Sequence, residues 1–165
     1  DVDGVLTDGT INIGNSGEIF KGFNAKDGLG ISCALRSGLN IAIITGRKSE
    51  IIHKRAEELG ISLLCEGVKD KYSELRRLAE ELQLTQDEIA YMGDDLNDLP
   101  AFKAAGVSFA PQDAATEVAV MANIVTTKCG GRGAVREAVE NILKAQNKWE
   151  ALVATYLESG QGDKQ

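Results

Sequence analysis

The stretch LNIAIITGRKSEIIHKRAEELGISLLCEG (residues 39–67) contains one complete strand–helix–strand unit. Residues 39–45 form a short apolar run that is typical of a buried strand. Residues 49–60 follow with helical spacing and end at Gly60, and residues 61–67 form a second apolar run. Two buried strands joined by a helix indicate a parallel sheet.

The same alternation continues toward the C-terminus. Strands are expected over residues 88–94, 107–110 and 123–127, and helices over residues 71–82, 98–106, near 113–121 and near 133–146. This order predicts an α/β fold of the Rossmann-like type, a three-layer arrangement with a parallel sheet and helices on both faces. Ligands of such sheets bind outside the carboxyl ends of the strands.

Two stretches fall outside the alternation. Residues 10–23 alternate apolar and polar side chains around a Gly-Asn-Ser-Gly turn, which predicts a small β-hairpin insertion. Residues 147–165 are expected to be helical to about Leu157 and disordered beyond it. Because the chain has 165 residues and no internal repeat or linker, we expect a single domain over residues 1–165.

The bulk composition excludes several classes of protein. A net charge of −7 argues against binding to nucleic acid, and no apolar run is long enough to span a membrane. The three cysteines are scattered, which favours reduced thiols in a cytoplasmic protein. His53 is the only histidine, so a histidine-based triad and a multi-histidine metal site are excluded.

Polar residues stand where the expected strands end. Thr45 and Gly46 follow one strand, Asp94 and Asp95 follow another, and Lys71 begins the helix after a third. Each has a plain structural explanation as well: Thr45 as a helix N-cap, Lys71 as a solvated residue and the aspartates as a turn. Their joint position at one edge of the sheet favours a binding site.

The carboxylates of this edge call for a cation. Asp1 and Asp3 open the chain, and together with Asp94, Asp95 and Asp98 they would place five like charges close together. Oxygen ligands of this kind suit Mg²⁺, which bridges carboxylates and phosphate.

A hydroxyl, backbone amides at a helix start and a lysine next to such a cation make a phosphoryl pocket, here from Thr45, Gly46 and Lys71. One of the two opening aspartates can attack phosphorus to give an aspartyl-phosphate, and the other can exchange the proton of the leaving oxygen. Gly4 would let the backbone turn closely around the phosphate.

Four motifs carry a resemblance to a known family. DVDGVLTDG (1–9), ITGR (44–47), DK (70–71) and GDDLND (93–98) resemble, in the same order, the motifs of the haloacid dehalogenase superfamily of phosphohydrolases. The resemblance implies that Asp1 is the nucleophile and Asp3 the acid/base. It also implies that Mg²⁺ is bound by the Asp1 carboxylate, the Asp94 carboxylate and the backbone carbonyl of Asp3, with support from Asp95 or Asp98. Thr45 and Lys71 would then bind the phosphate.

Along nearly the whole chain, with KDG (26–28) and GGRGAVRE (130–137) included, the sequence is similar to a branch of this superfamily without a large cap domain. This similarity implies hydrolysis of an eight-carbon sugar-acid 8-phosphate in lipopolysaccharide precursor synthesis. In the superfamily a hydrophobic strand precedes the nucleophile, so we expect residues ahead of Asp1.

Two alternatives remain open at this point. A phosphoacceptor signalling domain uses similar groups, but its adjacent acidic pair follows the first strand, whereas here the D-x-D comes first and GDD last. A phosphatase of a nine-carbon sialic-type sugar acid 9-phosphate is the second alternative. Arg47 favours the eight-carbon acid, as a bidentate partner of its carboxylate, although a solvated arginine is also possible. Arg132 is either a substrate or subunit contact or a solvated residue.

The hairpin predicts self-assembly. An isolated hairpin is marginally stable, and this one carries too many apolar residues to leave exposed. These residues are Ile11, Ile13, Ile19, Phe20 and Phe23. The resemblance implies a homotetramer, and we expect the hairpins to pack together in it. The alternative is a hairpin that folds back over its own domain.

Overall fold

The computed structural model describes residues 1–159 and confirms the α/β class. Each predicted strand of the alternation is present. One, β6 (Val107–Ala110), has the predicted bounds, and four are shorter than predicted: β3 (Ala42–Ile44), β4 (Leu63–Cys65), β5 (Ala90–Met92) and β7 (Ile124–Val125). β3 and β4 are parallel, with Ile43 opposite Leu64, and β5, β6 and β7 are parallel in that order.

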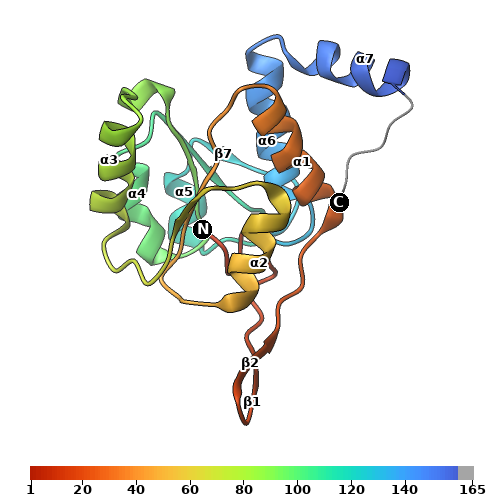
Figure 1. Ribbon diagram of the computed structural model, residues 1–165. Helices are drawn as coiled ribbons and strands as arrows, with labels where there is room; N and C mark the ends of the chain where they lie inside the picture. The colour runs from red at the N-terminus through yellow and green to blue at the C-terminus, as the bar shows by residue number, and fades with distance from the viewer. Residues whose placement is uncertain (160–165) are drawn as a thin grey trace.

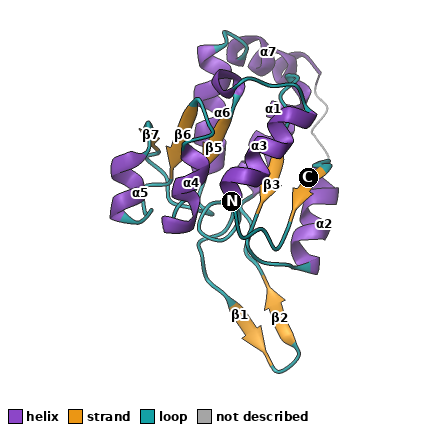
Figure 2. Ribbon diagram, turned by 90° about the vertical axis from the view of Figure 1, so that its left-hand side faces the viewer, coloured by secondary structure: helices purple, strands orange, loops and turns teal. Residues whose placement is uncertain are grey.

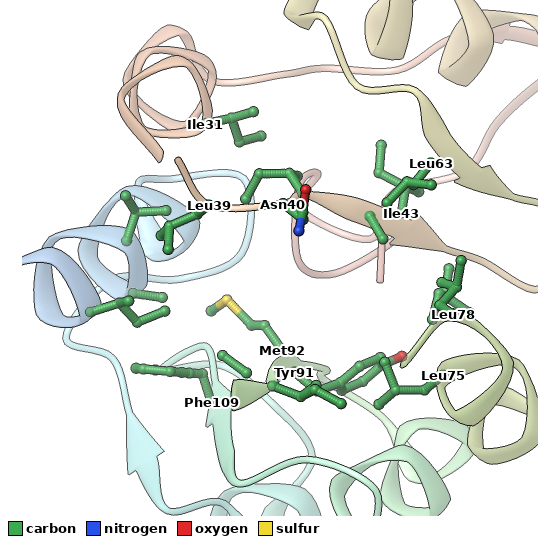
Figure 3. Close-up of a pocket in the computed structure, with 18 of the residues that line it drawn as sticks. Ile31, Leu39, Asn40, Ile43, Leu63, Leu75, Leu78, Tyr91, Met92 and Phe109 are labelled. Carbon is green, nitrogen blue, oxygen red and sulfur yellow. The ribbon is translucent and has the colours of Figure 1, made fainter. Parts of the chain in front are cut away.

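The strands pair as two separate sheets, β3 with β4 and β5 with β6 and β7. A cavity of about 580 Å³ lies between β3 and β5, lined by side chains such as Ile43, Tyr91 and Met92 (Figure 3). Within residues 1–159, β3 and β5 therefore each pair with a strand on one side only. The expected apolar strand ahead of Asp1 stays a prediction, and a cavity of this lining is compatible with it.

Helices cover both faces of the strands (Figures 1 and 2). They are α1 (Ala25–Arg36), α2 (Glu50–Leu59), α3 (Lys71–Glu81), α4 (Leu99–Phe102), α5 (Thr116–Met121), α6 (Ala134–Ala145) and α7 (Trp149–Ser159). Single 3₁₀ turns precede β5 (Gln86–Glu88) and α4 (Leu96–Asp98). Sequence reasoning assigned no element to α1. It also made α4 too long, because the N–H groups of residues 103–105 bond carbonyls three residues back and form turns in place of further helix.

The alternation of strand side chains divides the core. Ile44 of β3 packs with Leu75 and Leu78 of α3, in a cluster that also contains residues of α4 and α5. The next residue back, Ile43, points to the other face and packs with Ile31 of α1 and Ile52 of α2. This packing supports β3 and β5, at whose carboxyl ends the functional residues were expected.

The predicted hairpin is confirmed as antiparallel strands β1 (Asn12–Gly14) and β2 (Gly17–Phe20). It projects from the body at the end opposite α7 (Figures 1 and 2). Ile13 and Phe20 are 68% and 57% exposed, so the hairpin does not bury these two side chains against its own domain.

The C-terminal segment forms α7, as expected for the helical part, and Trp149 and Tyr156 pack against α1 and α6. The expected disorder of the last residues lies outside the described part of the chain. No helix in residues 1–159 is both long and apolar enough to cross a membrane.

Candidate active site

The first loop separates the two opening aspartates. The carbonyl of the buried Val2 accepts N–H groups from Val5, Leu6 and Thr7 at 3.1, 2.9 and 3.0 Å, which closes a tight turn. Asp1 and Asp3 lie on either side of Val2, and each carboxylate contacts a different lysine, Lys71 in one case and Lys21 in the other.

Asp1 belongs to a buried group of residues, here called the acidic floor: Asp1, Lys71, Tyr91, Asp94 and Asp98. The Lys71 side chain is 2% exposed, and its Nζ lies 2.9 Å from Asp1 Oδ1 and 2.6 Å from Asp98 Oδ1. The Tyr91 hydroxyl donates to Asp98 Oδ1 at 2.7 Å. Burial, together with the charge of Asp98, raises the pKa of Tyr91 well above its usual range, so this hydroxyl stays a donor. Lys71 is therefore not the solvated residue that the sequence left possible.

The acidic floor fits a divalent cation. Oxygen atoms of Asp1, Asp94 and Asp98 lie within 4.8 Å of one another, and one lysine is too little charge to balance them. Asp94 Oδ1 is buried without a hydrogen-bond partner. Burial, followed by the charge of Asp98, raises the pKa of Asp94 to about 6. An unpartnered oxygen among hard oxygen donors is the environment that Mg²⁺ requires.

Gly4 lies directly over the acidic floor. Its φ of +92° is the left-handed region that favours glycine, and a Cβ atom there would lie 1.9 Å from Asp94 Oδ2. The backbone therefore approaches the Asp94 carboxylate closely, and the predicted close turn of Gly4 around the phosphate stays a prediction.

Two further predicted metal residues contact other groups. The carboxylate of the exposed Asp95 accepts the N–H of Leu96 at 2.7 Å and caps a 3₁₀ turn. Asp98, by contrast, is fully buried, and its second oxygen accepts the N–H groups of Asp94 and Asp95 at 3.1 and 3.3 Å. Asp98 thus shapes the loop that presents Asp94, while Asp95 as a metal ligand stays a prediction.

Asp3 belongs to a second group, here called the hairpin rim: Asp3, Glu18, Lys21, Arg47 and Ser49. Lys21 Nζ lies 2.5 Å from Asp3 Oδ1 and 2.9 Å from Glu18 Oε1, and Arg47 Nε lies 3.7 Å from Asp3 Oδ2. The Arg47 side chain is half exposed, so it can reach a ligand. Sequence reasoning missed Lys21 and Glu18, although a lysine between Phe20 and Phe23 was a signal, because a lysine in an apolar segment needs a partner when it is buried.

Thr45 and Gly46 end β3, as predicted. Thr45 is buried, and its hydroxyl accepts the N–H of Arg47 at 3.3 Å. The N-cap of α2 is Ser49, whose hydroxyl accepts the N–H of Ile52, so Thr45 is not needed as a helix cap. The Thr45 hydroxyl, which accepts the Arg47 N–H, still has its own O–H to donate to a phosphate oxygen, and this role is a proposal.

The GGRG segment (130–133) packs against the first loop. The N–H of Gly131 donates to Val5 O at 2.9 Å, and a Cβ atom at Gly130 would lie 1.8 Å from Gly4 O. Arg132 itself is exposed, with Nη2 3.7 Å from Asp8 Oδ2. The glycines therefore hold the loop in place, while Arg132 lies at its outer edge.

Sequence reasoning also missed Asp27. This buried carboxylate accepts the N–H groups of Gly133 and Arg136 at 3.1 and 2.9 Å, and so satisfies the start of α6. Burial raises the pKa of Asp27, although these backbone donors oppose the rise. The aspartate of KDG therefore fixes the helix that follows GGRG.

Comparison with known proteins gives consistent matches. A family model described as haloacid dehalogenase-like hydrolase matches residues 64–138. The 3-deoxy-D-manno-octulosonate 8-phosphate phosphatase KdsC of Escherichia coli K12 is 47% identical over 148 residues, which cover 90% of this chain and 79% of the relative.

Solved structures of related phosphatases are also similar to this chain. The 3-deoxy-D-manno-octulosonate 8-phosphate phosphatase of Moraxella catarrhalis, in complex with magnesium ion, phosphate ion and KDO, is 43% identical and superposes with a TM-score of 0.91 over 94% of this chain and 89% of its own. The cobalt-bound phosphatase of Haemophilus influenzae is 39% identical, with a TM-score of 0.91 over 95% of this chain and 93% of its own.

Proposed function

The chain belongs to the haloacid dehalogenase-like hydrolase family, and on that premise we propose that it is a Mg²⁺-dependent phosphatase of 3-deoxy-D-manno-octulosonate 8-phosphate. The products are the free sugar acid and phosphate. The observation that carries the chemistry is the acidic floor, in which an unpartnered Asp94 oxygen lies beside Asp1 and Lys71. The relatives are hydrolases, which favours turnover over the phosphoacceptor signalling alternative.

The residues of the chain divide the reaction between them. Asp1 and Asp94, with the Asp3 carbonyl, would hold Mg²⁺, which when bound supplies positive charge for the phosphate oxygens. The Asp1 carboxylate attacks phosphorus and forms an aspartyl-phosphate, while Asp3 gives a proton to the departing sugar oxygen. Asp3 then takes a proton from the water that releases phosphate. Lys71 and Thr45, with the Gly46 amide, hold the phosphate oxygens.

The hairpin rim binds the sugar-acid part of the substrate. Arg47 is half exposed and lies next to Asp3, so its guanidinium can form a charge-assisted pair with the carboxylate of the sugar. Arg132 lies further out and would contribute less. The names of the relatives support the eight-carbon acid over the nine-carbon sialic-type alternative.

Turnover of a panel of phosphates tests this function. The panel contains the eight-carbon 8-phosphate, a nine-carbon sialic-type 9-phosphate and a small phosphomonoester, each with Mg²⁺ and with excess chelator. We expect the highest kcat/KM for the eight-carbon substrate and no turnover in chelator. Full activity in chelator would show that the reaction does not depend on a metal. A preference for the nine-carbon 9-phosphate would show that this compound, and not the eight-carbon 8-phosphate, is the substrate.

The cellular setting and assembly follow as further proposals. We infer that the enzyme acts in lipopolysaccharide precursor synthesis and is cytoplasmic; its three free cysteines support the cytoplasmic location. We also infer a homotetramer that packs through the exposed hairpin residues Ile13, Ile19 and Phe20. Replacing Ile13 and Phe20 with glutamate should dissociate the assembly in light scattering while the core still melts cooperatively. A wild-type monomer with full activity would end the tetramer proposal.

A further inference from the structure

Lys21 is a buried lysine at the edge of the active site, and no role has so far been assigned to it. It follows β2 directly, and its side chain is 1% exposed. Its ammonium contacts two carboxylates, Asp3 at 2.5 Å and Glu18 at 2.9 Å. Burial alone would lower the pKa of Lys21, but the hydrogen bonds to Asp3 and Glu18 outweigh it and raise the pKa, so the group stays a cation. A lysine buried in this way is too enclosed to bind substrate directly.

Glu18 links this lysine to a third segment of the site. The Ser49 hydroxyl donates to the second carboxylate oxygen of Glu18, and Ser49 is the N-cap of α2. The backbone N–H of Ser49 in turn donates to Glu66 at 2.9 Å. The contacts therefore run from the start of α2, through the base of the hairpin, to the Asp3 carboxylate.

Asp3 has one firm and one loose contact. Lys21 contacts one carboxylate oxygen at 2.5 Å from a buried position, whereas Arg47 approaches the other at 3.7 Å from a half-exposed position. If Arg47 turns to the carboxylate of a bound sugar acid, as the proposed function requires, the contact from Lys21 remains. A carboxylate that must reach a leaving oxygen within hydrogen-bond distance needs such a fixed direction.

We propose that Lys21 is a positioning residue: supported by Glu18, it holds the Asp3 carboxylate in the direction required for proton transfer. This inference rests on the proposed role of Asp3 as acid/base. It assigns to the base of the hairpin a part in turnover that is separate from assembly and from recognition of the sugar acid.

Steady-state kinetics of Lys21→Met on two phosphates tests this role. For the sugar-acid phosphate, whose alkoxide leaving group needs a proton, kcat should fall about 10- to 100-fold with little change in KM. For nitrophenyl phosphate, whose leaving group departs without a proton, the fall in kcat should be smaller. Lys21→Arg should recover part of the loss, and Lys26→Met, an exposed lysine of α1, serves as the matched control and should equal the parent.

A second variant keeps the test decisive if Lys21→Met does not fold. Glu18→Gln removes the charge that supports Lys21 and should lower kcat several-fold on the sugar-acid phosphate. A folded Lys21→Met with kcat within about twofold of the parent would overturn the proposal, as would equal losses on both phosphates. If only Glu18→Gln can be measured, an unchanged kcat overturns it.

Asp3→Asn, measured alongside, separates this inference from the proposed function. An active Asp3→Asn would remove the acid/base role of Asp3 itself, and with it the proposed mechanism. An inactive Asp3→Asn together with a fully active Lys21→Met would remove only the role of Lys21.

Discussion

The acidic floor and the hairpin rim hold the two opening aspartates in different ways. Both pair an aspartate with a buried lysine, Asp1 with Lys71 and Asp3 with Lys21. The floor, however, is built from strand ends and from the start of α3, and its Asp98 carboxylate is held by the Tyr91 hydroxyl and by the backbone N–H of Asp94. The rim depends on a hairpin that projects from the body (Figure 2) and on the half-exposed Arg47.

This difference separates bond-making from recognition. A group in the floor has no solvent to replace its contacts, so its loss should lower kcat for every substrate. A group at the exposed edge of the rim acts on one part of one substrate, so its loss should raise KM for that substrate alone. Lys21 lies between the two, because it is part of the rim but buried.

Removing the nucleophile should have the largest effect. Asp1→Asn replaces a charged carboxylate with an amide that neither attacks phosphorus nor binds Mg²⁺ well, so kcat should fall on the order of 10⁴-fold or more on all phosphates. Quenched-flow or steady-state assays measure the loss. A wild-type kcat in this variant would show that Asp1 is not the nucleophile and that the acidic floor does not carry the reaction.

Lys71 should affect both activity and stability. Lys71→Met leaves Asp1 and Asp98 without their shared cation, so kcat should fall about 10²- to 10³-fold. The metal-free protein should lose roughly 3–5 kcal/mol in its free energy of unfolding, as expected when one partner of a buried ion pair is removed. Lys54→Met, an exposed lysine of α2, should change neither value. Equal behaviour of the two variants would contradict the buried network.

Arg47 should affect one substrate only. Arg47→Ala should raise KM for the eight-carbon sugar-acid phosphate by roughly 10- to 150-fold, the equivalent of losing a charge-assisted hydrogen bond worth about 1.5–3 kcal/mol. The KM for a small phosphomonoester should stay near that of the parent. Equal increases for both would mean that Arg47 does not bind the carboxylate of the sugar.

The smallest expected effect is on thermal stability as the pH changes. The folded-state pKa of Asp94, about 6, lies above its ordinary value of 3.8, so the metal-free protein loses stability as the pH rises between these values. Mg²⁺ binds the ionised form. The increase in Tm caused by Mg²⁺ should therefore be full at about pH 8 and shrink as the pH falls through 6.

The matched pair Asp94→Asn and Asp87→Asn checks the origin of this dependence. Asp94→Asn should lose most of the Mg²⁺ effect at both ends of the pH range. Asp87→Asn, at an exposed position before β5, should keep it. A Mg²⁺ effect that is independent of pH in the parent would show that Asp94 does not control metal binding.

The sequence predicted the floor better than the rim for a physical reason. Parallel strands bring their carboxyl ends to one edge, so Lys71 and Asp94 could be placed together from periodicity alone. The Lys21–Glu18–Ser49 contacts depend on how a hairpin leans on a helix start, which periodicity does not describe.

Individual residues show the same limit. Asp98 as a supporting metal ligand stays a prediction, but the sequence did not show that its carboxylate also contacts Lys71, Tyr91 and two backbone amides and so shapes the loop. Tyr91 was seen only as a strand residue, because its hydroxyl gains a role only when α3 brings Lys71 to the same carboxylate.

The central claim is that phosphate is transferred to Asp1, and trapping that intermediate tests it most directly. Asp3→Asn is mixed with the sugar-acid phosphate and Mg²⁺, quenched in acid and digested, and the peptides are analysed by mass spectrometry. We predict one phosphoryl group on the peptide that contains Asp1, located on Asp1 by fragmentation and absent from the Asp1→Asn/Asp3→Asn double variant. A phosphoryl group on any other residue of this variant would contradict the account.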